Sequence, residues 1–450
     1  MSTNGEERWQ AIKYQPQNQK NFHQWIHQKL RKLKQTHQKS FDVMNKYFPV
    51  EKTMTESMEK MTDDDIKVAA KECGFHPSIT ELLLAIQTDP IIHMFFHHMY
   101  EQQTVHLPPG KLCIQSWQEA LIVINECINE AIEFDHENPI TAPLYCIFSS
   151  PIATPVGNTC FLHEKVNALM KEILIEWGKY LTSKSSCYVL TDAPKGWFSI
   201  KALEAMPNFN ETYVCDPSKP FWGFTSWDDF FVRKFKDGAR SVDDEEDDCI
   251  IVNPCEATPY KVKWNVKKYD QFWIKEQNYS MEFVLNKNPL AAAFNGGTIY
   301  QGLLCATNYH RFHSPVNGII HHLDLVEGSY FSQPYIEGGY PILRDVLPYL
   351  AHVATRGIFY IKADNPNIGL IAFIAVGMTE VSTVEMTVKV GDRVKKGHEI
   401  GMFHYGGSNF LLVFRGEVNI KFDDQLLQGL NSGNIKLNKR IGHVLAPEIK

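Results

Sequence analysis

Apolar positions in the first 200 or so residues of the chain recur with the period of an amphipathic helix. The period is found in residues 21–48, 63–103, 116–134 and 163–181. It is strongest in the last of these segments, where Val166, Met170 and Leu174 form a stripe. The pattern predicts a helical N-terminal domain at residues 19–215, preceded by a flexible N-terminus at residues 1–18.

The pattern changes beyond the acidic run at residues 243–248. Short β-type runs follow, bounded by Gly, Pro and Asn: CIIVN, TIYQGLL, GIIHHLDLV, GIFYIKA, GLIAFIAV, STVEMTV and NFLLVF. The acidic run is typical of a solvated loop, because consecutive carboxylates cannot all face one metal ion. A helical domain followed by a β-rich domain at residues 216–450 gives an α+β fold class.

The first predicted helix is also basic, with Lys29, Arg31, Lys32 and Lys34 near its apolar positions Phe22, Ile26, Leu30 and Leu33. A basic amphipathic helix can lie on an anionic membrane surface. More commonly, the apolar face of such a helix docks on the core of its own domain. A weak contact with a membrane surface therefore stays open as a second interpretation.

The composition is that of a globular protein, with 44% hydrophobic and 22% charged residues in a chain of 450. A net charge of −7 argues against a dedicated nucleic-acid-binding protein. No run of 18 apolar residues is present, and the first residues lack a secretory or transit pattern. We therefore expect a cytoplasmic protein that binds no nucleic acid.

The ten cysteines are scattered, and none forms a C-x-x-C pair. This spacing supports neither a zinc knuckle nor a dithiol redox motif, so we predict no bound metal. Buried, reduced thiols in an intracellular protein are the simplest interpretation.

Two histidines three residues apart occur in residues 309–315 (YHRFHSP). His310 and His313, with Arg311 between them, provide a general base and a cation that can bind an anion. A polar turn with exposed histidines is the alternative that the pattern alone leaves open. A metal pair is weakly supported, because no third ligand lies nearby at a recognisable spacing.

A Gly-Gly-Ser sequence, Gly406 to Ser408, precedes the last apolar run. Glycine permits strained backbone geometry and leaves its carbonyl carbon open to attack by the hydroxyl of the next residue. The sequence is therefore compatible with a self-cleaving peptide bond between Gly407 and Ser408. An ordinary tight turn explains the same glycines.

Three motifs in this order resemble the phosphatidylserine decarboxylase family, whose members carry a pyruvoyl group made from their own chain. They are residues 230–240 (FFVRKFKDGAR), residues 309–315, and the run from Gly391 to Ser408. The helical part and residues 221–230 also resemble one branch of the family, the fungal-type L-tryptophan decarboxylases. The resemblance implies that the β-rich domain is a phosphatidylserine-decarboxylase-like catalytic domain.

Two positions depart from the family pattern. Asn409 follows Ser408 where the broad family carries Thr. The family's Pro-Ala-Asp-Gly element is Pro-Cys-Glu-Ala here, so that Glu256 replaces an aspartate and adds a methylene group. The tryptophan-decarboxylase branch shares this Cys-Glu pair, which makes it a trait of the branch.

The resemblance implies a self-processing reaction. His313, oriented by Glu256, takes the proton of Ser408, and the serine oxygen attacks the Gly407 carbonyl to give an ester. Elimination and hydrolysis then cut the chain between residues 407 and 408, and the two chains remain associated.

The cofactor implied by the resemblance is a covalent pyruvoyl group derived from Ser408. Its ketone condenses with the substrate amine, and the group withdraws the electrons released as CO₂ leaves. His310 is the residue expected to hold the substrate carboxylate or to reprotonate the carbon.

The leading hypothesis for the substrate is a free, aromatic amino acid, with L-tryptophan as the candidate. A phosphatidylserine decarboxylase that makes phosphatidylethanolamine is the alternative within the family, and the basic helix would then touch anionic lipid. A non-catalytic binding or scaffold protein is the third hypothesis, which Asn409 and Glu256 support best.

Overall fold

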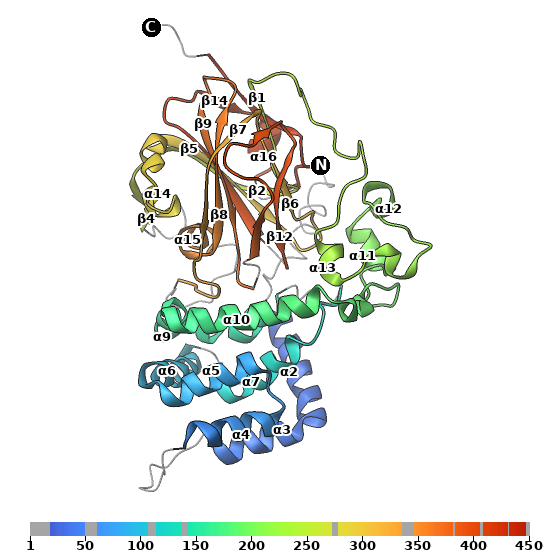
Figure 1. Ribbon diagram of the computed structural model, residues 1–450, viewed down its shortest axis with the longest axis vertical. Coiled ribbons are helices and arrows are strands. Elements are labelled where there is room, and N and C mark those ends of the chain that lie inside the picture. Colours follow the sequence, from blue (N-terminus) through green and yellow to red (C-terminus); the bar gives the residue numbers. More distant parts are fainter. Residues whose placement is uncertain are drawn as a thin grey trace.

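The computed structural model describes residues 19–49, 61–106, 114–136, 142–271, 278–334, 346–380, 383–405, 408–430 and 432–446. Within these ranges, helices dominate up to residue 231 and strands dominate from residue 250 onward (Figure 1). The predicted α+β fold class is confirmed. The predicted flexible segment 1–18 and the Gly406–Gly407 pair lie outside the described residues.

The helical region, as we call the part up to residue 231, includes α2 (Gln19–Thr36), α3 (Gln38–Tyr47), α4 (Asp63–Cys73), α5 (Pro77–Thr88), α6 (Pro90–His106), α7 (Trp117–Cys127), α8 (Pro143–Phe148), α9 (Pro155–Leu162), α10 (Glu164–Leu181), α11 (Ile200–Ala205), α12 (Phe209–Thr212) and α13 (Trp227–Phe231). Helix α7 ends earlier than predicted, because the chain after Cys127 bonds to other segments. The backbone N–H of Phe134, for example, donates to the Lys195 carbonyl at 2.9 Å.

Helix α10 lies between helices α2 to α7 and the β-rich region (Figure 1). Its buried residues recur every three or four positions, as the sequence predicts: Val166, Met170, Ile173, Leu174, Trp177, Gly178 and Leu181. This helix therefore brings the helical region up to the sheets.

Helix α2 docks on the protein itself. Ile26, Leu30 and Leu33 are buried, and the Lys29 ammonium pairs with Glu130. The Lys34 ammonium pairs with Glu119 on α7 at 3.0 Å. The docked interpretation of this basic helix is confirmed, since the apolar face that membrane binding would use is covered.

The β-rich region is built on an antiparallel sheet of seven strands in the order β11-β7-β8-β9-β13-β5-β2. These are β2 (Thr258–Val266), β5 (Gly297–Leu304), β7 (Gly318–Val326), β8 (Arg356–Ala363), β9 (Leu370–Val376), β11 (Arg393–Val394) and β13 (Ser408–Phe414). Strand β13 pairs with β5 on one side and β9 on the other, and every one of its residues is buried. The apolar run NFLLVF is thus a central strand.

Smaller sheets flank this one. Strands β10 (Thr383–Met386), β12 (Glu399–His404) and β6 (Arg311–His313) form one, and β1 (Ile250–Val252), β15 (Arg440–Val444) and β14 (Ile420–Phe422) form another. Strands β3 (Tyr269–Gln271) and β4 (Asn278–Ser280) pair separately, and α14 (Met281–Val284), α15 (Leu347–Val353) and α16 (Asp424–Gln428) complete the region.

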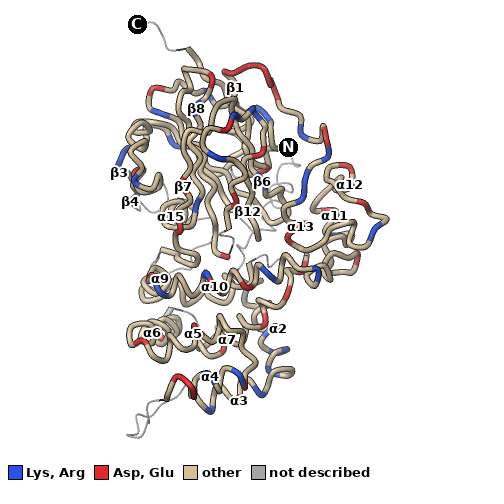
Figure 2. Tube along the Cα trace, in the orientation of Figure 1, with Lys and Arg blue, Asp and Glu red and all other residues tan. Residues whose placement is uncertain are grey.

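The acidic run 243–248 is a largely exposed loop beside β1, where Figure 2 shows it as a red segment. Asp243 accepts hydrogen bonds from the Lys439 ammonium at 2.7 Å and from the Arg440 N–H at 3.1 Å. The Lys396 ammonium donates to backbone carbonyls of the same loop. The acidic side chains therefore face solvent and basic partners, which agrees with the predicted solvated loop.

No single helix in the described ranges is long and apolar enough to cross a membrane. Helices α5 and α6 pass that test of length and composition only as a pair, and they are bent by 97° at the break between them. The cysteines within these ranges are all free thiols.

Candidate active site

Ser408 is the first residue of the central strand β13. Its Cα lies opposite that of Leu304 on β5, and the side chain is fully buried. The hydroxyl oxygen has no hydrogen-bond partner among the described residues. An unsatisfied buried hydroxyl is costly and needs an explanation, of which a role in a reaction is one. The position therefore fits a serine that reacts with its own chain and becomes the pyruvoyl group.

Asn409, the residue that departs from the family pattern, is also fully buried. Its side-chain oxygen accepts a hydrogen bond from the Gln301 amide at 2.9 Å, while its own amide nitrogen has no partner within the described ranges. The side-chain oxygen of Asn409 is thus held by Gln301 of β5. The side-chain NH₂ group of Asn409, the residue after Ser408, is without a partner among the described residues.

The two predicted histidines lie beside different parts of β12, the strand whose C-terminal end precedes Ser408 in the chain. Strand β6 pairs with β12 so that His313 lies opposite Glu399, at the start of β12. The backbone N–H of Phe403, near the end of β12, donates to the His310 carbonyl at 2.9 Å. Three residues of extended chain span about 10 Å. His310 is therefore the histidine nearer the end of β12 from which the chain continues to Ser408.

His313 makes two hydrogen bonds through its ring. Nδ1 lies 2.7 Å from the Gly397 carbonyl, which only accepts, so Nδ1 carries the proton. Nε2 then accepts a hydrogen bond from the Tyr309 hydroxyl at 3.0 Å. Although the residue as a whole is half-buried, burial of the ring lowers the pKa of His313 to about 4. The imidazole is neutral near pH 7, as a general base must be.

Glu256 does not contact His313, contrary to the orientation expected from the sequence. Its carboxylate pairs with the Arg240 guanidinium, which lies 4.5 Å from the Phe235 ring centroid. Burial raises the pKa of Glu256, and the charge of Arg240 opposes that rise. The ring nitrogens of His313 are instead engaged by Gly397 and Tyr309, and a role for Glu256 in self-processing stays a prediction.

His310 is fully buried and stacks on Phe231, with 3.8 Å between ring centroids. Neither ring nitrogen makes a hydrogen bond of good geometry with a described residue, although the Asn308 backbone lies near enough to oppose the pKa shift. Burial, followed by the positive charge of Arg233, holds the pKa of His310 well below its usual range. A neutral imidazole with two unengaged nitrogens can donate a proton to, or accept one from, a bound molecule.

Arg311, expected to bind an anion, is engaged elsewhere. Its guanidinium donates to the Val232 carbonyl at 2.6 Å and to the Glu399 carboxylate at 2.7 Å. The buried cation beside His310 is Arg233, which donates to the Asn308 carbonyl at 2.8 Å. Arg233 and Arg240 belong to the motif at residues 230–240, but no role was predicted for either. The structure places Arg233 beside His310 and pairs Arg240 with Glu256.

Sequence reasoning also missed Glu380, a buried carboxylate in the segment after β9. It accepts hydrogen bonds from the backbone N–H groups of Leu144 at 3.0 Å and Tyr145 at 2.9 Å, in the first turn of α8. Burial raises the pKa of Glu380 to about 7 in spite of these bonds. The contact joins the β-rich region to the helical region, and no local pattern signals a partner so distant in sequence.

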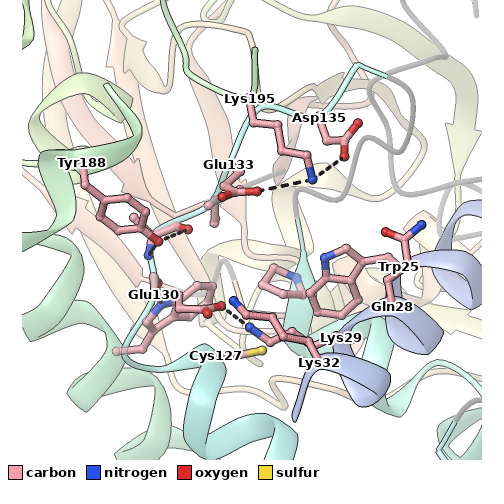
Figure 3. A pocket seen from close by; sticks show the side chains of 14 residues that line it. Trp25, Gln28, Lys29, Lys32, Cys127, Glu130, Glu133, Asp135, Tyr188 and Lys195 are labelled. Atoms are coloured by element: carbon pink, nitrogen blue, oxygen red, sulfur yellow. Dashed lines mark hydrogen bonds and ion pairs between the residues drawn. The ribbon is translucent and has the colours of Figure 1, made fainter. Parts of the chain in front are cut away.

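A cavity of about 330 Å³ opens in the helical region (Figure 3). Trp25, Tyr188 and Trp177 give it aromatic walls, while the Lys29–Glu130 and Lys195–Asp135 pairs give it charges of both signs. None of the predicted catalytic residues lines it. Within the described ranges, no group of three or more His, Cys, Asp or Glu side chains is arranged to hold a metal ion.

Two family models match the chain. The model described as phosphatidylserine decarboxylase matches residues 227–443, which contain Ser408, His310 and His313. A second model with the same description matches residues 76–206 in the helical region. The chain belongs to the phosphatidylserine decarboxylase family and is a decarboxylase, in other words a carboxy-lyase.

Several curated proteins are similar to this chain. "Decarboxylase iboD" of Amanita muscaria is 42% identical over 326 residues, which cover 68% of this chain and 92% of that protein. The L-tryptophan decarboxylase of Psilocybe cubensis is 34% identical over 372 residues, covering 77% and 82%. Phosphatidylserine decarboxylase proenzyme 3 of Schizosaccharomyces pombe is 29% identical over 252 residues, covering 55% and 25%.

Proposed function

We propose that this protein is a pyruvoyl-dependent decarboxylase of a free amino acid, with an aromatic amino acid such as L-tryptophan as substrate. The observation that carries the proposal is the buried Ser408 hydroxyl, which has no hydrogen-bond partner within the described ranges and lies at the start of a central strand in a chain of a pyruvoyl-dependent family. The similarity to the L-tryptophan decarboxylase, over more than four-fifths of that protein, supports the substrate class, and the similarity to iboD supports decarboxylation.

Self-cleavage begins at Ser408 in this proposal. The serine oxygen attacks the preceding carbonyl carbon, and the neutral His313 takes the proton, directly or through the Tyr309 hydroxyl. Burial keeps Tyr309 protonated by raising its pKa, so its hydroxyl can pass a proton on. The chains cut between Gly407 and Ser408 stay together, because β13 is hydrogen-bonded between β5 and β9.

The decarboxylation step uses the pyruvoyl group, whose ketone binds the substrate amine and whose carbonyls accept the electron pair left by CO₂. The residues of the chain supply the rest. His310 holds the substrate carboxylate by donating a hydrogen bond, or returns a proton to the carbon after CO₂ has left. Phe231 fixes the plane of that imidazole and keeps water from it.

Intact-mass measurement of the purified protein tests the processing. We expect two chains, residues 1–407 and residues 408–450, the second beginning with a pyruvoyl group that reacts with a carbonyl reagent. A single uncut chain, or a second chain that begins with serine, contradicts the proposal.

Release of CO₂ tests the substrate. Purified protein is supplied with L-tryptophan, L-phenylalanine and L-glutamate in parallel, and with phosphatidylserine in detergent micelles at the same carboxylate concentration. We expect release from an aromatic amino acid and none from the lipid. Release from phosphatidylserine alone, with phosphatidylethanolamine as product, favours the second candidate function, which the name of the matching family model supports.

A further inference from the structure

Tyr405, three residues before Ser408, has a backbone conformation that tyrosine seldom adopts. Its φ is 60°, in the left-handed region, where a bulky residue is rare and strained by about 1–3 kcal/mol. The side chain is buried, so contacts from the surrounding structure hold this conformation in place. The groups that contact Tyr405 therefore influence how the chain leaves β12 on its way to Ser408.

Trp177 of helix α10 makes one of these contacts. The rings of Trp177 and Tyr405 lie within 12° of parallel, with 5.9 Å between centroids. The indole N–H donates to the Glu130 carbonyl at 2.9 Å, and the tryptophan side chain is fully buried. The indole is therefore a fixed surface against which the tyrosine ring rests.

Gly178, the next residue of α10, makes room for the tyrosine hydroxyl. Glycine inside a helix costs about 1 kcal/mol relative to alanine, so its presence needs a reason. A Cβ atom at this position would lie 1.7 Å from the Tyr405 hydroxyl oxygen and 2.9 Å from the ring carbon that bears it. Only glycine at residue 178 permits this close approach of helix and tyrosine.

His404, directly before Tyr405, is held from two sides. Its Nδ1 hydrogen-bonds to Asp228 on α13 at 2.9 Å, and its Nε2 to Glu385 on β10 at 3.0 Å. Burial alone would lower the pKa of His404, but the two carboxylates outweigh burial and raise it. The residues before the Gly-Gly-Ser sequence are thus anchored by the helical region and by the neighbouring strand together.

We propose that α10 acts as a clamp on the end of β12, with Trp177, Gly178 and Tyr405 as positioning residues for self-cleavage. The clamp fixes where the chain leaves β12, while the pairing of β13 fixes Ser408, so the clamp controls how the preceding chain approaches the serine oxygen. In that step the C–O bond forms as the amide C–N bond breaks, and the proton of the hydroxyl passes through a base to the departing nitrogen. The proposal rests on the proposed self-cleavage at Ser408.

The central experiment uses Gly178→Ala in the full chain. The added methyl group collides with the Tyr405 hydroxyl and shifts the end of β12, and a displacement of about 1 Å can slow a positioned reaction 100-fold. We expect cleavage of the newly made chain to slow by about 10- to 100-fold, as measured by the appearance of the shorter chains over time.

A second substitution tests whether the effect passes through Tyr405. Tyr405→Phe removes the oxygen at 1.7 Å and leaves the ring carbon at 2.9 Å. We expect G178A/Y405F to regain part of the lost cleavage rate, since the ring carbon still has to move slightly, and Y405F alone to cleave almost normally. If G178A does not fold, Trp177→Ala and Trp177→Phe replace it, with slow cleavage expected for the first and near-normal cleavage for the second.

Trp222→Ala is the matched control. Trp222 has a φ of 54° and stacks on Phe198 within 8° of parallel at 4.3 Å, so it shares the strain and the stacking of Tyr405 and Trp177 but precedes a different segment. We expect W222A to lower the melting temperature while folded protein cleaves at the normal rate. A merely structural role predicts instead that cleavage follows melting temperature in all variants.

The outcomes separate the two proposals. An uncut wild-type chain contradicts self-cleavage at Ser408 itself. A wild-type chain that is cut, together with G178A and W177A that fold and are cut equally fast, overturns the clamp. Slow cleavage in G178A that Y405F does not relieve also overturns it, because the tyrosine is then not the route of the effect.

Discussion

The helical region and the β-rich region contribute different things to one site. The β-rich region holds the proposed reactive groups, since Ser408, His310 and His313 lie on or beside strands whose backbone pairing fixes their positions. The helical region contacts residues near these groups: Trp177 of α10 stacks on Tyr405, and the first turn of α8 donates hydrogen bonds to Glu380. The chemistry is therefore positioned by sheet register, and the shape around it by the packing of helices against that sheet.

The largest expected effect comes from removing the reactive group of the β-rich region. Ser408→Ala deletes the attacking oxygen, so the chain should stay whole and release no CO₂ from any substrate. Intact mass and a carbonyl reagent measure this. Ser314→Ala is the matched control: Ser314 is equally buried, but its hydroxyl donates to the Val316 carbonyl at 2.7 Å, and cleavage should persist. Two chains from S408A would contradict the assignment.

The two histidines should separate the two reactions. His313→Asn removes the proposed base and should slow cleavage by about 100- to 10,000-fold. His310→Asn should leave cleavage largely intact and lower kcat for decarboxylation. Because the pKa of His313 is about 4, cleavage should be flat above about pH 5 and fall as pH approaches 4, where the imidazole becomes protonated. If H310N blocks cleavage and H313N does not, His310 is the base for cleavage instead. His310 lies nearer than His313 to the end of β12 from which the chain continues to Ser408.

A smaller effect is expected at the contact between the two regions. Burial raises the pKa of Glu380 to about 7, so the folded protein binds a proton that the unfolded chain has already released. This contribution to stability is therefore full at low pH and is lost as pH rises through 7. Glu380→Gln cannot titrate, and the change in its melting temperature between pH 5 and 8 should differ from the wild type by roughly 3 °C. Glu245→Gln, at an exposed position, is the control. If melting temperature depends on pH in the same way in E380Q and in the wild type, Glu380 does not link stability to pH.

The smallest effect concerns the basic helix α2. The Lys29–Glu130 pair is mostly buried on the lysine side and open on the glutamate side, so its loss should cost about 1 kcal/mol. A double-mutant cycle of Lys29→Ala and Glu130→Ala, followed by urea denaturation, measures the coupling. The coupling free energy of the Lys34–Glu119 pair, whose lysine is more exposed, should be smaller. Equal coupling free energies for the two pairs would show that burial of Lys29 does not strengthen its ion pair.

Much of the fold follows from local pattern. The stripe on α10 and the continuous apolar run of β13 give their elements directly, because the first has a helical period and the second is buried on both faces. Strand β2 escaped prediction, since it contains Pro259 and its buried positions do not alternate regularly. Strand β6 escaped as well: three residues carry too short a pattern, and backbone pairing with β12 makes it a strand.

The site was predictable only where a motif carries it. Ser408, His310 and His313 come from ordered motifs, whereas the partners of Glu256 and Arg311 depend on where the chain turns in space. Arg240 is 16 residues from Glu256 and Glu399 is 88 residues from Arg311, and no spacing rule connects either pair. The Glu380 contact with α8 spans more than 230 residues and depends entirely on how the two regions pack.

The central place of β13 has a consequence for the mature enzyme. If the chain is cut ahead of Ser408, as we propose, the C-terminal chain carries β13, a central strand paired on both edges. No covalent bond then holds this strand near its neighbours if the sheet opens. The precursor can refold as one chain, but the cut enzyme must reunite two molecules at a rate that falls with dilution. We expect heating to be reversible for S408A and irreversible for the processed form, so that maturation gives activity at the expense of recoverability.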